Sequence, residues 1–139
     1  MDTPESFIEH YRTVFERFSA PEILEHFAFP LQVAGDIVSG VIVTVAASKD
    51  QWTQQLETLL AGYRKLGVTR SQARSLEVVT ISPNLVQARL HWDLFDGAGD
   101  PIYDFHSVYT LGRFEGRLRI IAIAHDELPR LRGALAKAP

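Results

Sequence analysis

The stretch that decides the fold is residues 85–95, Leu-Val-Gln-Ala-Arg-Leu-His-Trp-Asp-Leu-Phe, in which apolar and polar side chains alternate. A period of two is typical of a strand that buries one face and leaves the other in water. The apolar face comprises Val86, Ala88, Leu90, Trp92 and Leu94. Further strands are predicted near residues 75–82, 102–111 and 117–125, with turn-forming residues between them. The second half of the chain therefore predicts an antiparallel meander.

The residues before the meander predict three helices and two short strands. The first helix is opened by Thr3 and Pro4 and carries an apolar stripe at helical spacing. Helices followed by a run of strands form an α+β order, and 139 residues suit one domain over 1–139. The other expected elements are a short helix after Ser19 that carries Ile23, Leu24 and Phe27, strands over Leu31–Ala34 and Val41–Ala46, a helix opened by the capping-box spacing of Ser48 to Gln51, and a terminal helix over Leu128–Ala136.

Composition excludes several classes of protein. The net charge is −3 and the Lys and Arg residues form no cluster, which argues against nucleic-acid binding. The chain has no cysteine, so disulfides, thiolate metal sites and thiol catalysis are excluded. The first residues are acidic and polar, and the longest apolar run is too short to span a bilayer. We therefore expect no membrane contact and a cytoplasmic location.

Two turn lengths predict which side chains meet inside the sheet. A five-residue loop over 96–100 would pair Phe95 with Pro101, which sets Trp92 opposite Asp104 and Leu90 opposite His106. A four-residue turn over 113–116 would pair Gly112 with Arg117. The pairs that follow are Asp104 with His125, His106 with Ile123, and Val108 with Ile121.

These registers predict an inward-facing polar cluster of Asp104, His106 and His125 beside Trp92. Buried ionisable groups need partners, and such clusters often mark ligand sites. Another reading is that Asp104 and His125 only satisfy each other at the rim of the sheet. Because a shift of one residue moves a side chain to the other face, the prediction depends on both turns.

Several groups of residues make the chain resemble the ketosteroid-isomerase and SnoaL-like branch of the NTF2-like superfamily. They are Thr3-Pro4-Glu5, Tyr11, the Phe27-Ala28 pair and Glu115-Gly116-Arg117-Leu118. The resemblance implies a cone in which N-terminal helices pack into a curved mixed or antiparallel sheet, the cystatin-like roll. It also implies a pocket inside the cone and, if the protein is an enzyme, an isomerase, cyclase or dehydratase without a cofactor.

The resemblance assigns roles to individual positions. Tyr11 falls where the isomerases keep the tyrosine that donates to the substrate oxyanion, and His125 falls at an aromatic wall position. The general-base aspartate of the isomerases maps onto Gly35, with Asp36 one place late, so Asp36 is a candidate base. Their second oxyanion donor maps onto Val108, which cannot donate. These two departures argue against steroid isomerase activity.

Two functions from different classes remain open. In the first, the cone binds a small, mainly apolar, carbonyl-bearing molecule and carries out acid–base chemistry through Tyr11, Asp104, His125 and Asp36. The expected ligand-binding residues are Trp92, His106, Val108, Ile123 and Leu90. In the second, the protein is a non-catalytic dimeric module whose cone is filled by its own phenylalanine, leucine and tryptophan side chains.

The sequence also bears on a metal site and on a dimer. Asp104-x-His106 with His125 has the residue types of a two-histidine, one-carboxylate metal set. Because these residues converge only if both assumed turns are right, and a metal site also needs supporting residues around its ligands, we expect no metal and no cofactor. The last two strands also predict an apolar outer face, which favours a homodimer unless the terminal segment from Leu128 covers it. That face was expected to comprise Tyr103, Phe105, Tyr109, Leu118, Ile120, Ala122 and Ala124.

Overall fold

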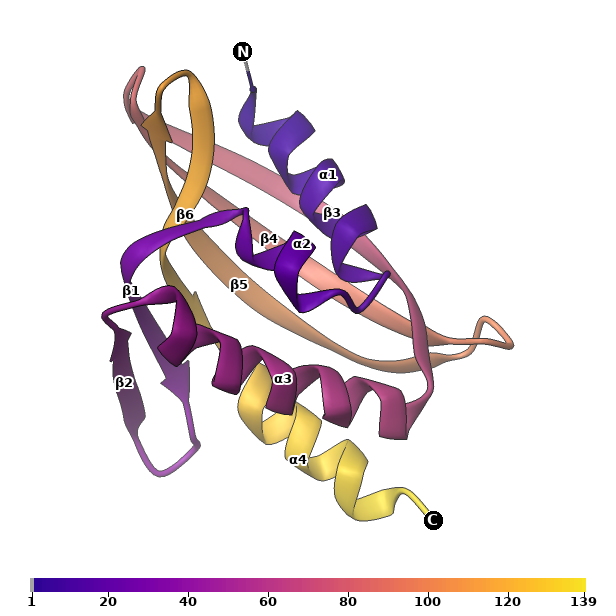
Figure 1. Cartoon of the computed structure of the whole chain (residues 1–139). Helices are drawn as coiled ribbons and strands as arrows, with labels where there is room; N and C mark the ends of the chain where they lie inside the picture. The colour runs from indigo at the N-terminus through magenta and orange to yellow at the C-terminus, as the bar shows by residue number, and fades with distance from the viewer. Residues whose placement is uncertain (1) are drawn as a thin grey trace.

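The computed structural model describes residues 2–139, which form a curved sheet with helices on one face (Figure 1). The helices are α1 (Pro4–Phe15), α2 (Ala20–Leu24), α3 (Lys49–Leu66) and α4 (Glu127–Lys137). The strands are β1 (Phe27–Asp36), β2 (Val41–Ala46), β3 (Val68–Ser82), β4 (Leu85–Asp96), β5 (Pro101–Phe114) and β6 (Arg117–His125). This architecture confirms the predicted α+β class with helices packed into a curved sheet.

The sheet has the order β2-β1-β6-β5-β4-β3. The pair β1 and β6 is parallel and every other neighbouring pair is antiparallel, so the sheet is mixed. Helix α4 follows β6 and contacts β5, α3 and β1. In Figure 1 it lies beside α3, so the two helices close one end of the cone. No helix within residues 2–139 is long and apolar enough to cross a membrane.

The local signals that open the helices act as predicted. The side chain of Thr3 accepts a hydrogen bond from the Ser6 N–H at 3.1 Å, and Ser6 Oγ accepts from the Thr3 N–H at 3.0 Å. This reciprocal pair satisfies backbone donors that the first turn of α1 leaves free. Ser48 accepts from the N–H of Gln51 at 3.4 Å, and α3 ends at Gly67, whose φ of 75° suits glycine.

Two element boundaries differ from the prediction. Helix α2 ends at Leu24, and Phe27 begins β1 instead of closing the helix. Strand β3 begins at Val68, earlier than the predicted start near residue 75. Its first half is polar because β3 is an edge strand with an exposed face, so the apolar alternation there is weak.

The register between β4 and β5 departs from the prediction after its first pair. Phe95 does pair with Pro101, but an extra residue, Ile102, shifts the pairing so that Leu94 lies opposite Tyr103. Trp92 then lies opposite Phe105, and Leu90 lies opposite Ser107. A β-bulge of this kind moves every following side chain of β5 to the other face.

The turn between β5 and β6 is shorter than predicted. Phe114 pairs with Arg117, which leaves a two-residue turn of Glu115 and Gly116 with φ values of 52° and 82°. Two positive φ values match the type I′ hairpin turn. A second irregularity at Ile121 then sets Ser107 opposite His125. These two changes keep His125 on the helix-covered face, whereas the bulge at Ile102 places Asp104, His106 and Val108 on the opposite, outer face.

Aromatic and aliphatic side chains from all layers form one core. Helix α1 contributes a buried stripe that includes Phe7, Ile8 and Tyr11, as its spacing predicted. Tyr11 packs edge-on against Phe27 and Tyr109, with ring centroids 6.0 and 5.9 Å away. These side chains fill much of the cone and leave a cavity between α1, α3 and the sheet.

Candidate functional site

A cavity of about 100 Å³ lies between α1, α3 and the concave face of the sheet. This volume is somewhat below that of an apolar cavity that binds benzene, about 150 Å³, so the cavity suits at most a single-ring molecule. Most of its wall is apolar. The lining residues are Tyr11, Arg12, Phe15, Val33, Trp52, Leu56, Leu59, Tyr63, Ser71, Trp92, Leu94, Phe105, Ser107, Tyr109, Ile123, His125 and Glu127.

The structure separates the predicted site residues into two groups. Tyr11, Trp92, Ile123 and His125 line the cavity, and their roles in binding or catalysis stay predictions. Leu90 is buried on the same face of the sheet but belongs to the core and does not line the cavity. The residues predicted to face the cavity that lie elsewhere are Asp104, His106, Val108 and Asp36.

Asp36 lies at the end of β1, where its carboxylate has a local structural role. Its Oδ1 accepts a hydrogen bond from the N–H of Val38 at 3.0 Å, which stabilises the turn toward β2. The side chain is exposed and lies outside the cavity. The expectation that Asp36 rims the pocket as a base is therefore wrong, because the turn directs this carboxylate back to its own backbone.

Glu127 is the ionisable residue of the cavity that the sequence did not reveal. It begins α4, is only 7% exposed, and its Oε2 accepts hydrogen bonds from the hydroxyl of Tyr103 at 2.8 Å and from the hydroxyl of Tyr63. Burial raises the pKa of Glu127 to about 7, although the two tyrosine hydrogen bonds act in the opposite direction. A carboxyl group with such a pKa can both give and take a proton near neutrality.

No sequence signal distinguished Glu127, because an acidic residue in the first turn of a helix is common. Its significance depends on the packing of α4 against α3 and β5, which brings Tyr63 and Tyr103 to it. Tyr103 was expected on the outer face of the sheet, and Tyr63 belongs to α3, which is far from Glu127 in the sequence. Only the tertiary structure shows that both hydroxyls meet one carboxyl group.

His125 lies directly before this site and has a defined neutral form. Its Nδ1 accepts a hydrogen bond from the N–H of Glu127 at 3.1 Å, so neutral His125 carries its proton on Nε2. Burial lowers the pKa of His125, and Asp126 opposes this only in part. The imidazole is therefore a neutral hydrogen-bond donor at physiological pH. The predicted pairing of His125 with Asp104 is wrong, since Asp104 lies on the other face of the sheet.

Gly35 explains how His125 fits against β1. A Cβ atom at position 35 would lie 3.1 Å from Leu128 Cδ1 and 3.4 Å from His125 Nε2. The first of these distances is tighter than ordinary carbon contacts, so a side chain at this position would require the Leu128 side chain to shift by a few tenths of an ångström. The general-base aspartate of the isomerases maps onto this position. Here the side chains of His125 and Leu128 lie where the side chain of such an aspartate would be.

Two polar atoms of the cavity wall have no hydrogen-bond partner within residues 2–139. They are Nε1 of Trp52, a donor, and Oγ of Ser107, which can donate and accept. Trp52 is 8% exposed and Ser107 is 1% exposed. Leaving such groups without a partner costs about 1–3 kcal/mol each, so a water molecule or a ligand atom is expected to satisfy them.

The remaining polar groups of the wall are neutral hydroxyls. Trp92 Nε1 donates to the Tyr109 hydroxyl at 2.8 Å, which fixes the indole on the floor of the cavity. Burial raises the pKa of Tyr109 to about 12 and raises the pKa of Tyr11 well above its ordinary value. Both hydroxyls therefore keep their protons at physiological pH and can donate.

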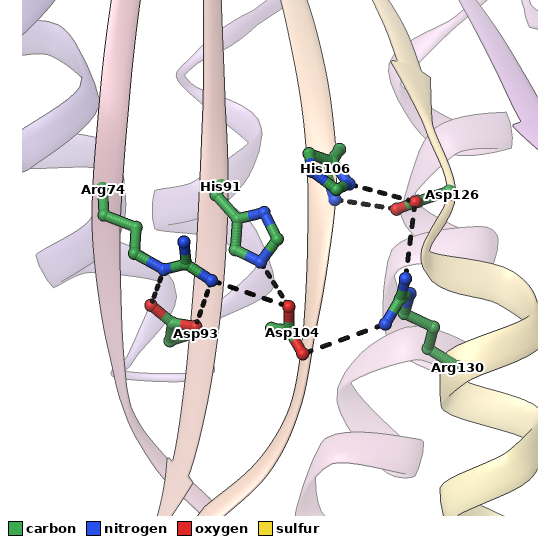
Figure 2. Close-up of polar contacts among 7 residues, drawn as sticks. All are labelled: Arg74, His91, Asp93, Asp104, His106, Asp126 and Arg130. Carbon is green, nitrogen blue, oxygen red and sulfur yellow. Dashed lines mark hydrogen bonds and ion pairs between the residues drawn. The ribbon is translucent and has the colours of Figure 1, made fainter.

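The outer face carries a separate network of charged side chains, shown in Figure 2. His91 on β4 contacts Asp104 on β5, and Asp104 also lies 3.7 Å from Arg74 and 3.8 Å from Arg130. His106 lies beside His91 with ring centroids 4.3 Å apart and contacts Asp126. The predicted inner cluster of Asp104, His106 and His125 therefore does not exist, because the bulge at Ile102 turned the first two residues outward.

Within residues 2–139, one group of side chains has donor atoms close enough to bind a metal ion. Atoms of His91, Asp93 and Asp104 lie within 4.8 Å of one another. Arg74 already pairs with Asp93 at 2.7 Å and with Asp104, so a guanidinium neutralises both carboxylates. The metal set considered from the sequence, Asp104 with His106 and His125, is divided between the two faces of the sheet.

The apolar outer face also differs from the prediction. Phe105, Tyr109, Leu118 and Ile120 are buried, because the true register directs them toward the helices. Exposed apolar side chains lie instead on the two edge strands: on β2, where Val41, Val43 and Val45 are 67%, 54% and 60% exposed, and on β3, where Val79 and Ile81 are each 57% exposed. The partners of the three β2 valines on β1 are Asp36, Ala34 and Gln32, which identifies this face as the outer one.

Comparison with known proteins identifies the fold. Residues 2–128 match the sequence profile of a family described as NTF2-like protein, DUF6841. No protein with a curated description matches the chain. A ketosteroid isomerase-like protein from Erwinia carotovora is 15% identical with a TM-score of 0.63, over 88% of this chain and 91% of that one.

Two further solved structures have no known function. An NTF2-like protein from Pseudomonas putida is 14% identical with a TM-score of 0.67, over 88% of this chain and 82% of that one. A protein with a cystatin-like fold from Nostoc punctiforme is 10% identical with a TM-score of 0.67, over 88% of this chain and 86% of that one. At such identities the likeness concerns the fold alone.

Proposed function

The chain belongs to the NTF2-like protein family DUF6841, and on that premise we propose that its cone binds a small, neutral, mainly apolar molecule carrying a carbonyl or hydroxyl oxygen. The observation that carries the proposal is the pair of unpartnered polar atoms, Trp52 Nε1 and Ser107 Oγ, in an otherwise apolar wall. An apolar cavity with a few polar groups is the usual form of a small-molecule site. In a cone that is filled only by its own side chains, Trp52 Nε1 and Ser107 Oγ would have no ligand atom to bind.

The charges around the cavity favour a neutral ligand. Arg12 is the only cationic side chain among the residues that line the cavity. Its guanidinium is bound to Glu9, Glu16 and the carbonyl oxygen of Ser71. Glu127 becomes negative above a pH of about 7 and would then repel an anion. Carboxylates and phosphates are therefore poor candidates.

The polar groups favour acid–base chemistry on the ligand. Glu127 is the group that can exchange a proton near neutral pH, while Tyr11 and His125 can donate hydrogen bonds to an oxygen that gains charge. This arrangement supports an isomerase-like or cyclase-like proton transfer beside a carbonyl, with Glu127 in the role that the sequence had suggested for Asp36 or His125. Asp104 has no part in it.

Ligand binding by single-ring compounds tests the proposal. We expect cyclohexanone and cyclohexanol to raise the melting temperature, and benzoate to leave it unchanged because it is anionic. Trp52→Phe and Ser107→Ala should each weaken binding about three- to tenfold, the range of one lost hydrogen bond. Asp104→Asn, on the outer face, is the matched control and should bind as the wild type does. If no neutral ring compound stabilises the protein, the filled, non-catalytic module is the better account.

We also propose that the protein is a homodimer through the outer face of β2 and β1. The three exposed valines on one face of β2 lie beside Ala34 and Ala124. Together they form an apolar surface that a second copy can cover. A twofold axis would place the same strand of each protomer against the other, as in most homodimers.

A further inference from the structure

The two oxygens of Glu127 have different surroundings. The hydroxyls of Tyr63 and Tyr103 both donate to Oε2, and within residues 2–139 no hydrogen bond is made to Oε1. An oxygen that already accepts two hydrogen bonds is a poor place for a proton. When Glu127 is neutral, its proton therefore lies on Oε1. Because Glu127 lines the cavity, Oε1 is the oxygen that remains available to a ligand.

The chemical character of Oε1 consequently depends on the proton. With the proton bound, Oε1–H donates a hydrogen bond and can meet a carbonyl oxygen. Without it, Oε1 is a charged acceptor that needs a donor and is repelled by the lone pairs of a carbonyl. A hydroxyl group can donate or accept, so it suits both states. A ketone suits only the first.

We propose that Glu127 Oε1 selects the ligand by its own protonation state, so that the cavity binds ketones only when Oε1 carries the proton and binds hydroxyl compounds in either state. This inference rests on the proposed function, because it concerns the ligand of the same cavity. The atom that selects the ligand is then also the atom that exchanges a proton with it.

The groups around Glu127 leave it as the titrating member of the site. Tyr63 faces it from α3, Tyr103 from β5 and His125 from β6, while Tyr11 on α1 lines the same cavity. Burial raises the pKa of Tyr63, Tyr103 and Tyr11 and lowers the pKa of His125. All four therefore stay neutral around pH 7.

The charged groups near Glu127 lie at its helix end and on α1. Asp126 precedes it and opposes its ionisation, whereas Arg130 lies one turn further along α4, 3.9 Å from Asp126. Arg12, on α1, lines the cavity but is held by Glu9 and Glu16. The pKa of Asp126 lies below its ordinary value and that of Arg12 lies above its ordinary value, so neither changes its charge close to neutrality.

The test compares cyclohexanone with cyclohexanol, which share ring and size but differ in the polar group. Their affinities are measured by calorimetry at about pH 5.5 and about pH 8.5, on either side of the pKa of about 7. Because only the protonated fraction binds the ketone, its affinity should fall about tenfold for each pH unit above that pKa. The affinity for the alcohol should change much less, so the ratio of the two affinities should fall as the pH rises.

Three variants identify the responsible group. Glu127→Gln has a fixed amide and should remove the pH dependence of the ratio, whereas Asp104→Asn should keep it. Tyr103→Phe should move the fall of the ratio to higher pH, since loss of that donor raises the pKa of Glu127 further. If Tyr103 had only a structural role, its substitution would weaken the binding of both compounds equally and would leave the fall of the affinity ratio at the same pH.

The outcomes separate the two proposals. If both compounds bind with a ratio that does not change with pH, or if Glu127→Gln keeps the change, the selection by Oε1 is overturned and the proposed function stands. If neither compound binds at any pH, both are overturned. A carbon NMR titration that finds the Glu127 carboxyl ionised well below neutrality also overturns the selection, without any ligand.

Discussion

Glu127 is the residue whose burial has the clearest energetic consequence. Its pKa rises from 4.5 to about 7 on folding, and a rise of this size corresponds to about 3 kcal/mol. A raised pKa means that the native state holds the proton more tightly than the unfolded chain does. The contribution of Glu127 to stability is therefore complete below about pH 4.5 and is lost as the pH rises through about 7.

The variant Glu127→Gln isolates this effect. The free energy of unfolding of the wild type minus that of the variant should fall by up to about 3 kcal/mol between about pH 4.5 and above pH 7. Urea denaturation at a series of pH values measures it, and taking the difference cancels the histidines, which titrate in both proteins. A difference that stays constant with pH would show that Glu127 is not buried as a neutral acid.

At the same scale, the sequence predicted some side chains of the cavity and missed others for identifiable reasons. Tyr11 and Trp92 lie on regular apolar patterns, so their direction could be derived from periodicity alone. Asp104 and His106 were misplaced because one extra residue at Ile102 reversed the faces of β5, and nothing in the composition of residues 96–102 indicates a bulge there. Glu127 was missed because its partners come from distant elements.

Among the elements, the start of α4 determines where Glu127 lies. Asp126 fastens it to β5: its Oδ1 accepts from the His106 N–H at 2.7 Å, and its own N–H donates to the His106 carbonyl at 3.3 Å. These bonds continue the pairing of β5 beyond the end of β6. They hold the first turn of α4 beside Tyr103.

We expect Asp126→Ala to destabilise the protein by about 1–2 kcal/mol, because it removes the acceptor of a backbone N–H and the charge at the start of the helix. Amide hydrogen exchange in the first turn of α4 should become faster. Arg130→Ala removes two partly exposed ion pairs, with Asp126 at 3.9 Å and with Asp104 at 3.8 Å, and should cost much less. Equal effects of the two substitutions would argue that Asp126 does not hold α4 in place.

The elements themselves were well predicted where local chemistry decides them. The caps at Thr3 and Ser48 lie where the sequence placed them. The turn of Glu115 and Gly116 was mispredicted as a four-residue turn, because glutamate is an unusual residue at a position with positive φ. The pairing of strands, which depends on such turns, could therefore not be derived with the same certainty as the helices.

For the whole molecule, the outer face predicts a dimer whose interface includes β2. Sedimentation velocity at micromolar concentration should give twice the chain mass of 15.6 kDa. Val43→Lys, which places a charge in the middle of the apolar surface, should give the monomer. Val79→Lys is the matched control, since Val79 is also exposed but lies on β3 at the far edge of the sheet. A monomeric wild type, or a Val79→Lys protein that dissociates equally, would refute this interface.

The two indole N–H signals in a proton–nitrogen correlation spectrum report whether the cavity is open and holds a small ligand against Trp52. The chain has two tryptophans, and Trp92 already donates to Tyr109 whereas Trp52 has no partner within residues 2–139. Substitution of each tryptophan by phenylalanine assigns the signals. During titration with cyclohexanone at a pH below 7, we expect a saturable shift of the Trp52 indole signal as it gains an acceptor, with a smaller change for Trp92. If both signals stay unchanged up to the solubility limit of the ketone, the cavity does not take the ligand and the account is contradicted.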